Sequence, residues 1–181
     1  MTGRRRAWAF TQRANVAAAV ADTAALRLLA DSVAAAARGS AFGRDHRLPA
    51  YVHGLLLVQQ GHLAPAADSF RAAVYSPTQG YTRINAALAR TLIALGRPRE
   101  AIYWMQAALR GGMEASNYYL TRTDAHEVLA QTFAAAGQVD SARAQFALVV
   151  HAWADAEPLF RARRDSAAAY LARTARAGAS P

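Results

Sequence analysis

The sequence contains no cysteine and no lysine, and it has no apolar run long enough to cross a bilayer. Without cysteine the chain forms neither disulfides nor thiolate metal sites, which excludes stapled secreted scaffolds and thiol redox centres. A membrane-spanning helix needs about 20 consecutive apolar residues. Residues Arg4–Arg6 precede an apolar patch as in an export signal, but polar residues between 11 and 15 interrupt it. We therefore expect a cytoplasmic protein that is not embedded in a membrane.

All 21 basic side chains other than histidine are arginines, and they outnumber the acidic residues to give a net charge of +9. Such an excess raises the question of nucleic acid, which binds clustered cations. Most of these arginines are scattered; the exceptions are Arg4–Arg6 and a group at Arg161, Arg163 and Arg164. The scatter favours solvated faces and intramolecular pairs. Association with nucleic acid, as part of a transcriptional regulator, is the alternative function.

The abundance of alanine and the apolar periodicity favour helices throughout the chain. Three segments, 51–74, 86–109 and 127–150, each read as an apolar helix, a glycine and a second apolar helix. The glycines are Gly61, Gly96 and Gly137, spaced by 35 and 41 residues. Glycine ends a helix at low cost because it adopts left-handed backbone angles. The chain is therefore predicted to be all-α and built from antiparallel helix pairs.

Side-chain size repeats in register with these glycines. Five residues after each glycine the chain has an alanine, followed four residues later by a bulky side chain: Ala66 and Phe70, Ala101 and Met105, Ala142 and Phe146. The next contact positions are Ala73, Ala108 and Val149, and the first helices carry large-then-small pairs at His53–Gly54, Leu88–Ala89 and Leu129–Ala130. Small residues let two helices lie close together, so this register predicts three successive packed hairpins.

Over residues 47–172 the chain resembles the tetratricopeptide-repeat family, most clearly in GRPREAIYWMQAAL, and its last segment resembles the tetratricopeptide tails of bacterial multidomain regulators such as serine/threonine kinases and transcriptional activators. The resemblance implies a right-handed α-solenoid with three clear repeats. We divide the chain into a degenerate N-terminal pair and loop (1–46), the repeats (47–156), a capping helix (157–175) beginning near Pro158, and a frayed tail (176–181). The N-terminal helices are expected at 8–20 and 24–37, joined near Asp22 and Thr23.

The same resemblance implies a non-catalytic protein-interaction scaffold that binds a peptide or partner helix in the groove lined by the first helix of each pair. The resemblance places eight candidate groove residues at exposed positions of these helices: Tyr51, Leu55, Gln59, Arg83, Ala87, Arg90, Glu127 and Gln131. Arg83 and Arg90 lie two turns apart on one helix face. They either bind carboxylate or phosphate groups of a partner or pair with Asp124 and Glu127 of the next hairpin. Tyr51 and Leu55 do not match the lysine and asparagine of the family's clamp for acidic C-termini.

An insertion at 110–123, with Asn117, Tyr118 and Tyr119, interrupts the repeat and is either a contact loop or packed on Trp104 and Met105.

No catalytic, metal or cofactor site is predicted. His126 and Glu127 begin a zinc-protease motif, but Ala130 stands where its second histidine belongs. Ser76 and Ser116 lack the surroundings of a nucleophile, and Gly111 and Gly112 lack the lysine of a phosphate loop. The triplet Asp45–Arg47 is better explained as a polar loop entering a helix than as an acid–base group.

Overall fold

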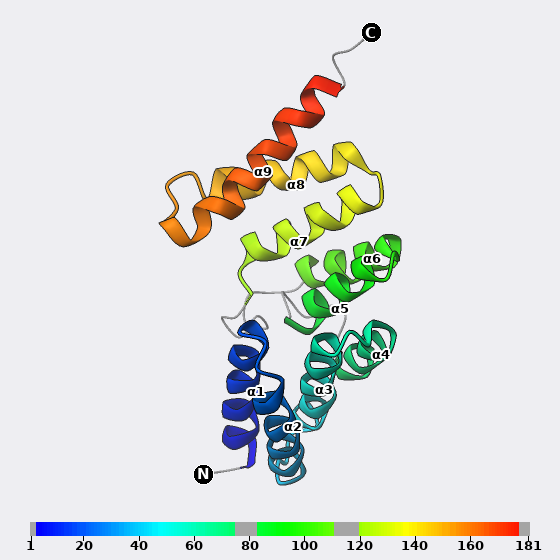
Figure 1. Cartoon of the computed structure of the whole chain (residues 1–181), viewed down its shortest axis with the longest axis vertical. Helices are drawn as coiled ribbons and strands as arrows, with labels where there is room; N and C mark the ends of the chain where they lie inside the picture. The colour runs from blue at the N-terminus through cyan, green and yellow to red at the C-terminus, as the bar shows by residue number, and fades with distance from the viewer. Residues whose placement is uncertain (1–2, 75–82, 111–119, 178–181) are drawn as a thin grey trace. The chain divides into compact units, whose positions relative to one another are not determined.

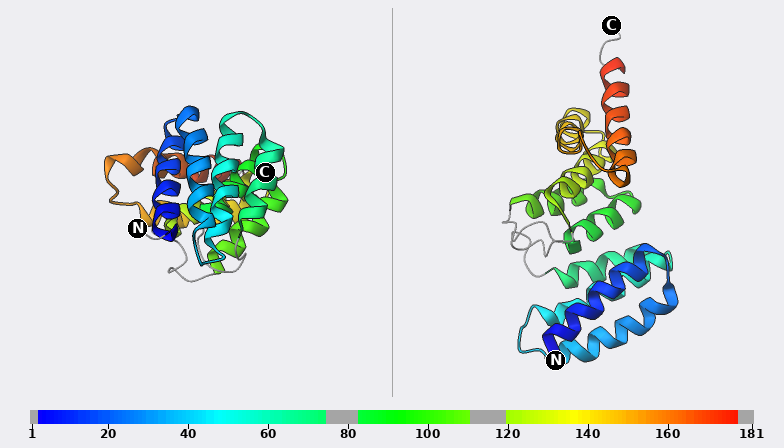
Figure 2. Two further views of the ribbon diagram at one scale, coloured as in Figure 1. Left: turned by 90° about the horizontal axis from the view of Figure 1, so that it is seen from below. Right: turned by 90° about the vertical axis from the view of Figure 1, so that its left-hand side faces the viewer.

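The computed structural model describes residues 3–74, 83–110 and 120–177. Within these ranges all regular secondary structure is helical, which confirms the predicted all-α class. The helices are α1 (Gly3–Ala19), α2 (Thr23–Arg38), a short 3-10 turn η1 (Asp45–Arg47), α3 (Leu48–Gln59), α4 (Leu63–Ala73), α5 (Arg83–Ala94), α6 (Pro98–Arg110), α7 (Arg122–Ala135), α8 (Val139–Ala152) and α9 (Pro158–Ala177). The antiparallel pairs can be followed in Figures 1 and 2.

The chain divides into two compact units, an N-terminal unit (Met1–Ser76) and a C-terminal unit (Pro77–Pro181). In the N-terminal unit α1 packs on α2 and α3, α2 packs on α3, and α3 packs on α4. In the C-terminal unit α5, α6, α7, α8 and α9 each pack on the next, and α5 also contacts α7. The sequence-based division placed α3 and α4 with the later repeats; in the structure α3 contacts α1 and α2, and α4 packs on α3. The expected helix start at Pro158 is confirmed.

Three hairpins are closed by one kind of glycine turn. Gly61, Gly96 and Gly137 have φ of 77°, 71° and 73°, as predicted for left-handed helix ends. In every case the residue after the glycine donates its backbone N–H to the carbonyl five residues earlier, at 2.8 to 2.9 Å. This bond satisfies a carbonyl that the end of the preceding helix would otherwise leave unpaired.

The hairpin α1–α2 has the same turn without the glycine. Ala21 has a φ of 57°, and Asp22 donates its N–H to the Ala17 carbonyl at 2.8 Å. The Asp22 carboxylate then accepts from the Ala25 N–H and caps α2, as expected from the sequence. An alanine in the left-handed region costs about 1–2 kcal/mol. Because this turn has no glycine, the sequence does not mark it as it marks the other three.

Ala21→Gly is therefore expected to raise the free energy of unfolding by about 1 kcal/mol, because glycine adopts the same φ without strain. The matched reverse change, Gly61→Ala, should lower it by a similar amount, since a Cβ there meets no atom within 4 Å and only the φ is unfavourable. Urea denaturation followed by circular dichroism measures both. Ala35→Gly, on the exposed face of α2, is the control and should destabilise. A loss of stability in Ala21→Gly would contradict this account of the turn.

Buried small residues occupy the predicted helix contacts. Ala66, Ala101 and Ala142 are fully buried, and so are their bulky neighbours Phe70 and Met105, with Phe146 nearly so. Gly54 marks a close approach of α3 to α4: a Cβ on it would lie 2.5 Å from a ring carbon of Phe70. The interhelical distance within α3–α4 is thus set by the absence of a side chain at this position.

Candidate functional site

A polar stripe on α5 carries three of the predicted groove residues. Arg90 is exposed, and Arg83 and Ala87 are half-buried. Leu88 and Leu92 on the opposite side are fully buried, which fixes the rotation of the helix. Because positions 83, 87 and 90 are three or four residues apart, their side chains lie on one face. The structure therefore brings together Arg83, Ala87 and Arg90 as a surface of the C-terminal unit.

The neighbouring helix α7 presents one exposed groove residue and one buried residue. Gln131 is exposed, whereas Glu127, one turn earlier, is only 7% exposed. Thr121 and Asp124 form a reciprocal capping box at the start of α7, with the Asp124 N–H donating to the Thr121 hydroxyl at 3.0 Å. The expectation that Glu127 is an exposed groove position is thus wrong, because another helix covers it.

That helix is α9, whose Arg163 binds both acidic residues of α7. The Arg163 Nη2 lies 2.6 Å from Asp124 Oδ1 and also contacts Glu127 Oε2, while Nε lies 3.1 Å from Glu127 Oε2. On its other side the guanidinium stacks over the Trp153 ring, 4.5 Å from its centroid. We call Arg163, Asp124, Glu127 and Trp153 the α7–α9 cluster. Asp124 and Glu127 are therefore bound by Arg163. The sequence had suggested Arg83 and Arg90 as their partners and did not predict the contact with α9.

The electrostatics of the cluster favour its charged form. Burial by itself raises the pKa of Asp124, but hydrogen bonds from Thr121 and Arg163, together with the charge of Arg163, outweigh it and hold the pKa below the ordinary value of 3.8. The hydrogen bond to Glu127 is the main cause that raises the pKa of Arg163 above its ordinary value, against the effect of burial. Asp124 and Arg163 are thus each stabilised in the ionised state.

The remaining groove candidates belong to α3 in the N-terminal unit. Tyr51 is 3% exposed, and its hydroxyl donates to Asn15 Oδ1 of α1 at 2.7 Å. Leu55 is half-buried, and the exposed Gln59 donates from Nε2 to the Ala18 carbonyl at 3.0 Å. The predicted exposure of Tyr51 is therefore wrong, because α1 packs on this side of α3. No local signal in α3 distinguishes a surface tyrosine from one that pairs with an asparagine 36 residues away.

The residues considered for chemistry have structural partners. The fully buried Asp45 accepts from Trp8 Nε1 at 2.9 Å and from Ser40 Oγ at 2.6 Å, which ties α1 to the loop before α3. His126 Nδ1 lies 2.7 Å from Gln145 Oε1 on α8. Among the described residues no group of three His, Asp or Glu side chains is arranged to hold a metal ion.

Several of the sequence-based expectations fall outside the described residues. These are the serines and glycines considered for chemistry and most of the insertion: Ser76, Gly111, Gly112, Ser116, Asn117, Tyr118 and Tyr119. In the ranges 3–74, 83–110 and 120–177, no helix combines the length and hydropathy needed to cross a membrane.

The surface that the geometry offers is thus the α5 stripe; α5 contacts α7, on which Gln131 is exposed. No protein-family model, curated protein or solved structure matches this chain.

Proposed function

We propose that this chain is a non-catalytic protein-interaction module of the tetratricopeptide type, working in a bacterial regulatory system. The proposal is supported by the repeated hairpin: left-handed turns at Gly61, Gly96 and Gly137, each followed five residues later by a fully buried alanine. Helix pairs of this kind stack on their neighbours and act through the surface they display rather than through a catalytic centre.

The α5 stripe is the surface that we propose for binding. Arg83 and Arg90 frame the small side chain of Ala87, and Gln131 adds a donor and an acceptor from the neighbouring helix. Small residues between long cationic ones let a peptide backbone approach while the guanidinium groups bind its carboxylates by forked hydrogen bonds. The partner is therefore an acidic or phosphorylated segment, bound as an extended peptide or a helix.

The observation that carries the proposal is that Arg83 and Arg90 lie on one face of α5, opposite its buried leucines. Asp124 and Glu127 form ion pairs with Arg163. Helix α9 thus engages the two acidic residues that the sequence offered as alternative partners for Arg83 and Arg90.

The double substitution Arg83→Glu/Arg90→Glu is expected to weaken binding of acidic peptides by at least about tenfold, because two attractive charges become repulsive. Peptides are first selected on the immobilised wild-type chain from a displayed random library. We expect them to be rich in aspartate and glutamate. Their dissociation constants for the wild type and the variant are then compared by fluorescence anisotropy.

The control variant is Arg27→Glu/Arg99→Glu, which makes the same change in net charge at exposed positions of α2 and α6. It should retain most of the affinity, and circular dichroism should show unchanged helix content in both variants. Selected peptides that bind the Arg83→Glu/Arg90→Glu variant as tightly as the wild type would refute the assignment of the stripe.

A further inference from the structure

A second basic surface lies on α1, in the N-terminal unit. This helix carries Arg4, Arg5, Arg6 and Arg13 and no acidic residue between positions 3 and 19. Arg4 is engaged by Phe42, with its guanidinium 4.1 Å from the ring centroid. Arg6 and Arg13 are exposed, and no described residue forms an ion pair or hydrogen bond with either. Their positive charge is directed at solvent.

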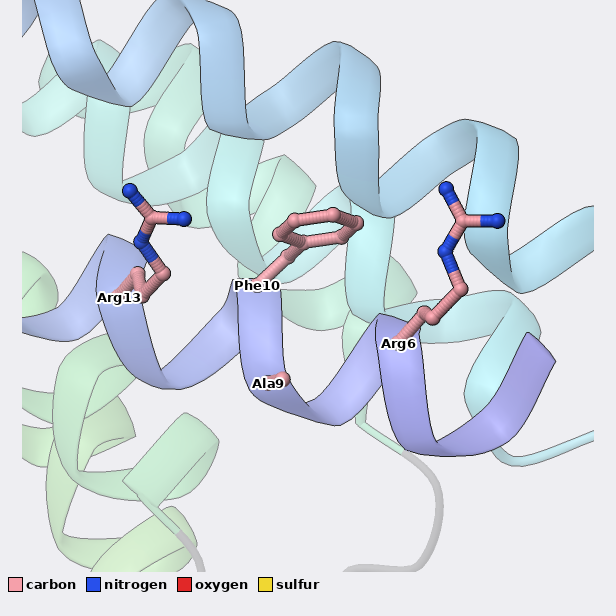
Figure 3. Close-up of a pocket in the computed structure, with 4 residues that line it drawn as sticks. All are labelled: Arg6, Ala9, Phe10 and Arg13. Carbon is pink, nitrogen blue, oxygen red and sulfur yellow. The ribbon is translucent and has the colours of Figure 1, made fainter. Parts of the chain in front are cut away.

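These two arginines flank an apolar floor. A hollow of about 490 Å³ is lined by Arg6, Ala9, Phe10 and Arg13. Figure 3 shows both guanidinium groups extending to the same side of α1, with the Phe10 ring between them. Residues 6, 10 and 13 are spaced by four and three, so they succeed one another along one face over two turns, about 10 Å.

The apolar character continues to the end of α1 and one residue beyond it. Val16 and Val20 are 65% and 69% exposed, and they follow Arg13 at intervals of three and four residues. Two exposed arginines flank the half-buried Phe10 and are followed by two exposed valines, which differs from an ordinary solvated helix face, which is polar. This arrangement provides both anion recognition and apolar contact area.

We propose that this α1 face docks an acidic amphipathic helix of another protein, with two carboxylates that bind Arg6 and Arg13 and an apolar side chain between them that rests on Phe10 and Ala9. In an antiparallel partner the matching positions are a glutamate, an apolar residue three later and a second glutamate seven after the first. Each guanidinium binds a carboxylate through two N–H groups.

Charge and pattern decide among the possible occupants. A second copy is disfavoured because each chain carries a net charge of +9 and the two would repel. A helix that lies on a lipid surface separates its basic and apolar faces, whereas here Arg6, Phe10 and Arg13 interleave on one side. Nucleic-acid phosphates would match the arginines but leave the Phe10 and valine row without a partner. This surface is distinct from the α5 stripe, and the inference stands without it.

The test uses the full chain and a fluorescein-labelled, alanine-rich helical peptide with glutamates seven residues apart and a leucine three residues after the first. At about 20 mM salt, where screening is weak, we expect Arg6→Glu/Arg13→Glu to weaken binding at least about tenfold. Phe10→Ala should weaken it several-fold with the charges intact. The matched control Arg27→Glu/Arg99→Glu and the variant Arg83→Glu/Arg90→Glu should both bind nearly as the wild type does.

Two probe controls complete the experiment. A peptide with glutamine in place of both glutamates, and one with serine in place of the leucine, should each bind more weakly than the parent. Equal binding of the parent peptide to the wild type and to Arg6→Glu/Arg13→Glu would overturn the proposal. Competition by a single-stranded oligonucleotide or by vesicles with phosphatidylserine would also overturn it under two conditions. The competitor must displace the labelled peptide at a lower concentration than the unlabelled peptide does, and Phe10→Ala must leave the binding of the competitor unchanged.

Discussion

Replacing Phe70 with alanine is expected to lower the free energy of unfolding of the N-terminal unit by about 4 kcal/mol. The ring is 1% exposed, lies 5.9 Å from the Tyr51 ring between centroids, and fills the space left by Gly54. Its loss removes buried apolar area and leaves a cavity between α3 and α4. Urea denaturation monitored by Trp8 fluorescence, with Trp104 and Trp153 replaced by phenylalanine, reports on this unit alone.

The close approach of Gly54 to Phe70 provides a sharper check. Gly54→Ala should cost about 2 kcal/mol in the wild type, because its Cβ would lie 2.5 Å from the ring, and clearly less in a Phe70→Leu background. Gly43→Ala is the matched control, since a Cβ there meets no atom within 4 Å. An equal cost of Gly54→Ala in both backgrounds would mean that the helix separation is not set by this contact.

Replacing Arg163 with leucine is expected to lower the free energy of unfolding by about 3 kcal/mol. Leucine keeps an apolar side chain near Trp153 but leaves the carboxylates of Asp124 and Glu127 without their cation. Breaking one side of a buried ion pair is costly for this reason, and the partial exposure of Arg163 places the value at the low end of the usual range. Denaturation followed by Trp153 fluorescence, in a chain with the other tryptophans replaced, measures it.

Two variants separate this cause from a general weakening of α9. Arg161→Leu, at an exposed position two residues earlier, should change stability by less than about 1 kcal/mol. Adding Asp124→Asn and Glu127→Gln to Arg163→Leu should recover part of the loss, because the uncompensated charges are removed. If the neutral pair recovers nothing, packing rather than charge accounts for the effect.

The pH dependence of the same cluster follows from the lowered pKa of Asp124. In the folded state the pKa lies below 3.8, so the unfolded state takes up a proton first as the pH falls. The contribution of Asp124 is therefore complete above about pH 5 and is lost as the pH falls through the folded-state pKa. The difference in stability between the wild type and Asp124→Asn should be constant from about pH 5 to 7 and should shrink below about pH 4.

The sequence predicted the helix pairs well because the relevant signals are local. Gly61, Gly96 and Gly137 mark left-handed turns through a property of the single residue, and Asp22 and Pro158 mark helix starts in the same way. The sequence also placed a turn near Asp22 and Thr23, but the left-handed conformation of Ala21 was not predicted because alanine carries no such signal. Its φ is imposed by the packing of α1 on α2, which outweighs the local cost.

The candidate site was predicted only in part. The stripe at Arg83, Ala87 and Arg90 follows from helical periodicity and from the buried leucines opposite. The predicted exposure of Tyr51 and Glu127 is wrong for one shared reason: each side chain bonds to a helix 36 residues away in sequence. The sequence pattern is the same whether a polar residue on a helix face is exposed to water or covered by another helix.

By itself the sequence determined that the chain is helical, where the helices pair, and which small residues lie at their contacts, since these depend on periodicity and on single-residue backbone preferences. Only the tertiary structure decided that α1 covers α3, that α9 binds the acids of α7, and that the contacts divide into two units. Those outcomes depend on which surfaces meet, and the free energy of that choice is spread over many weak contacts that no short motif records.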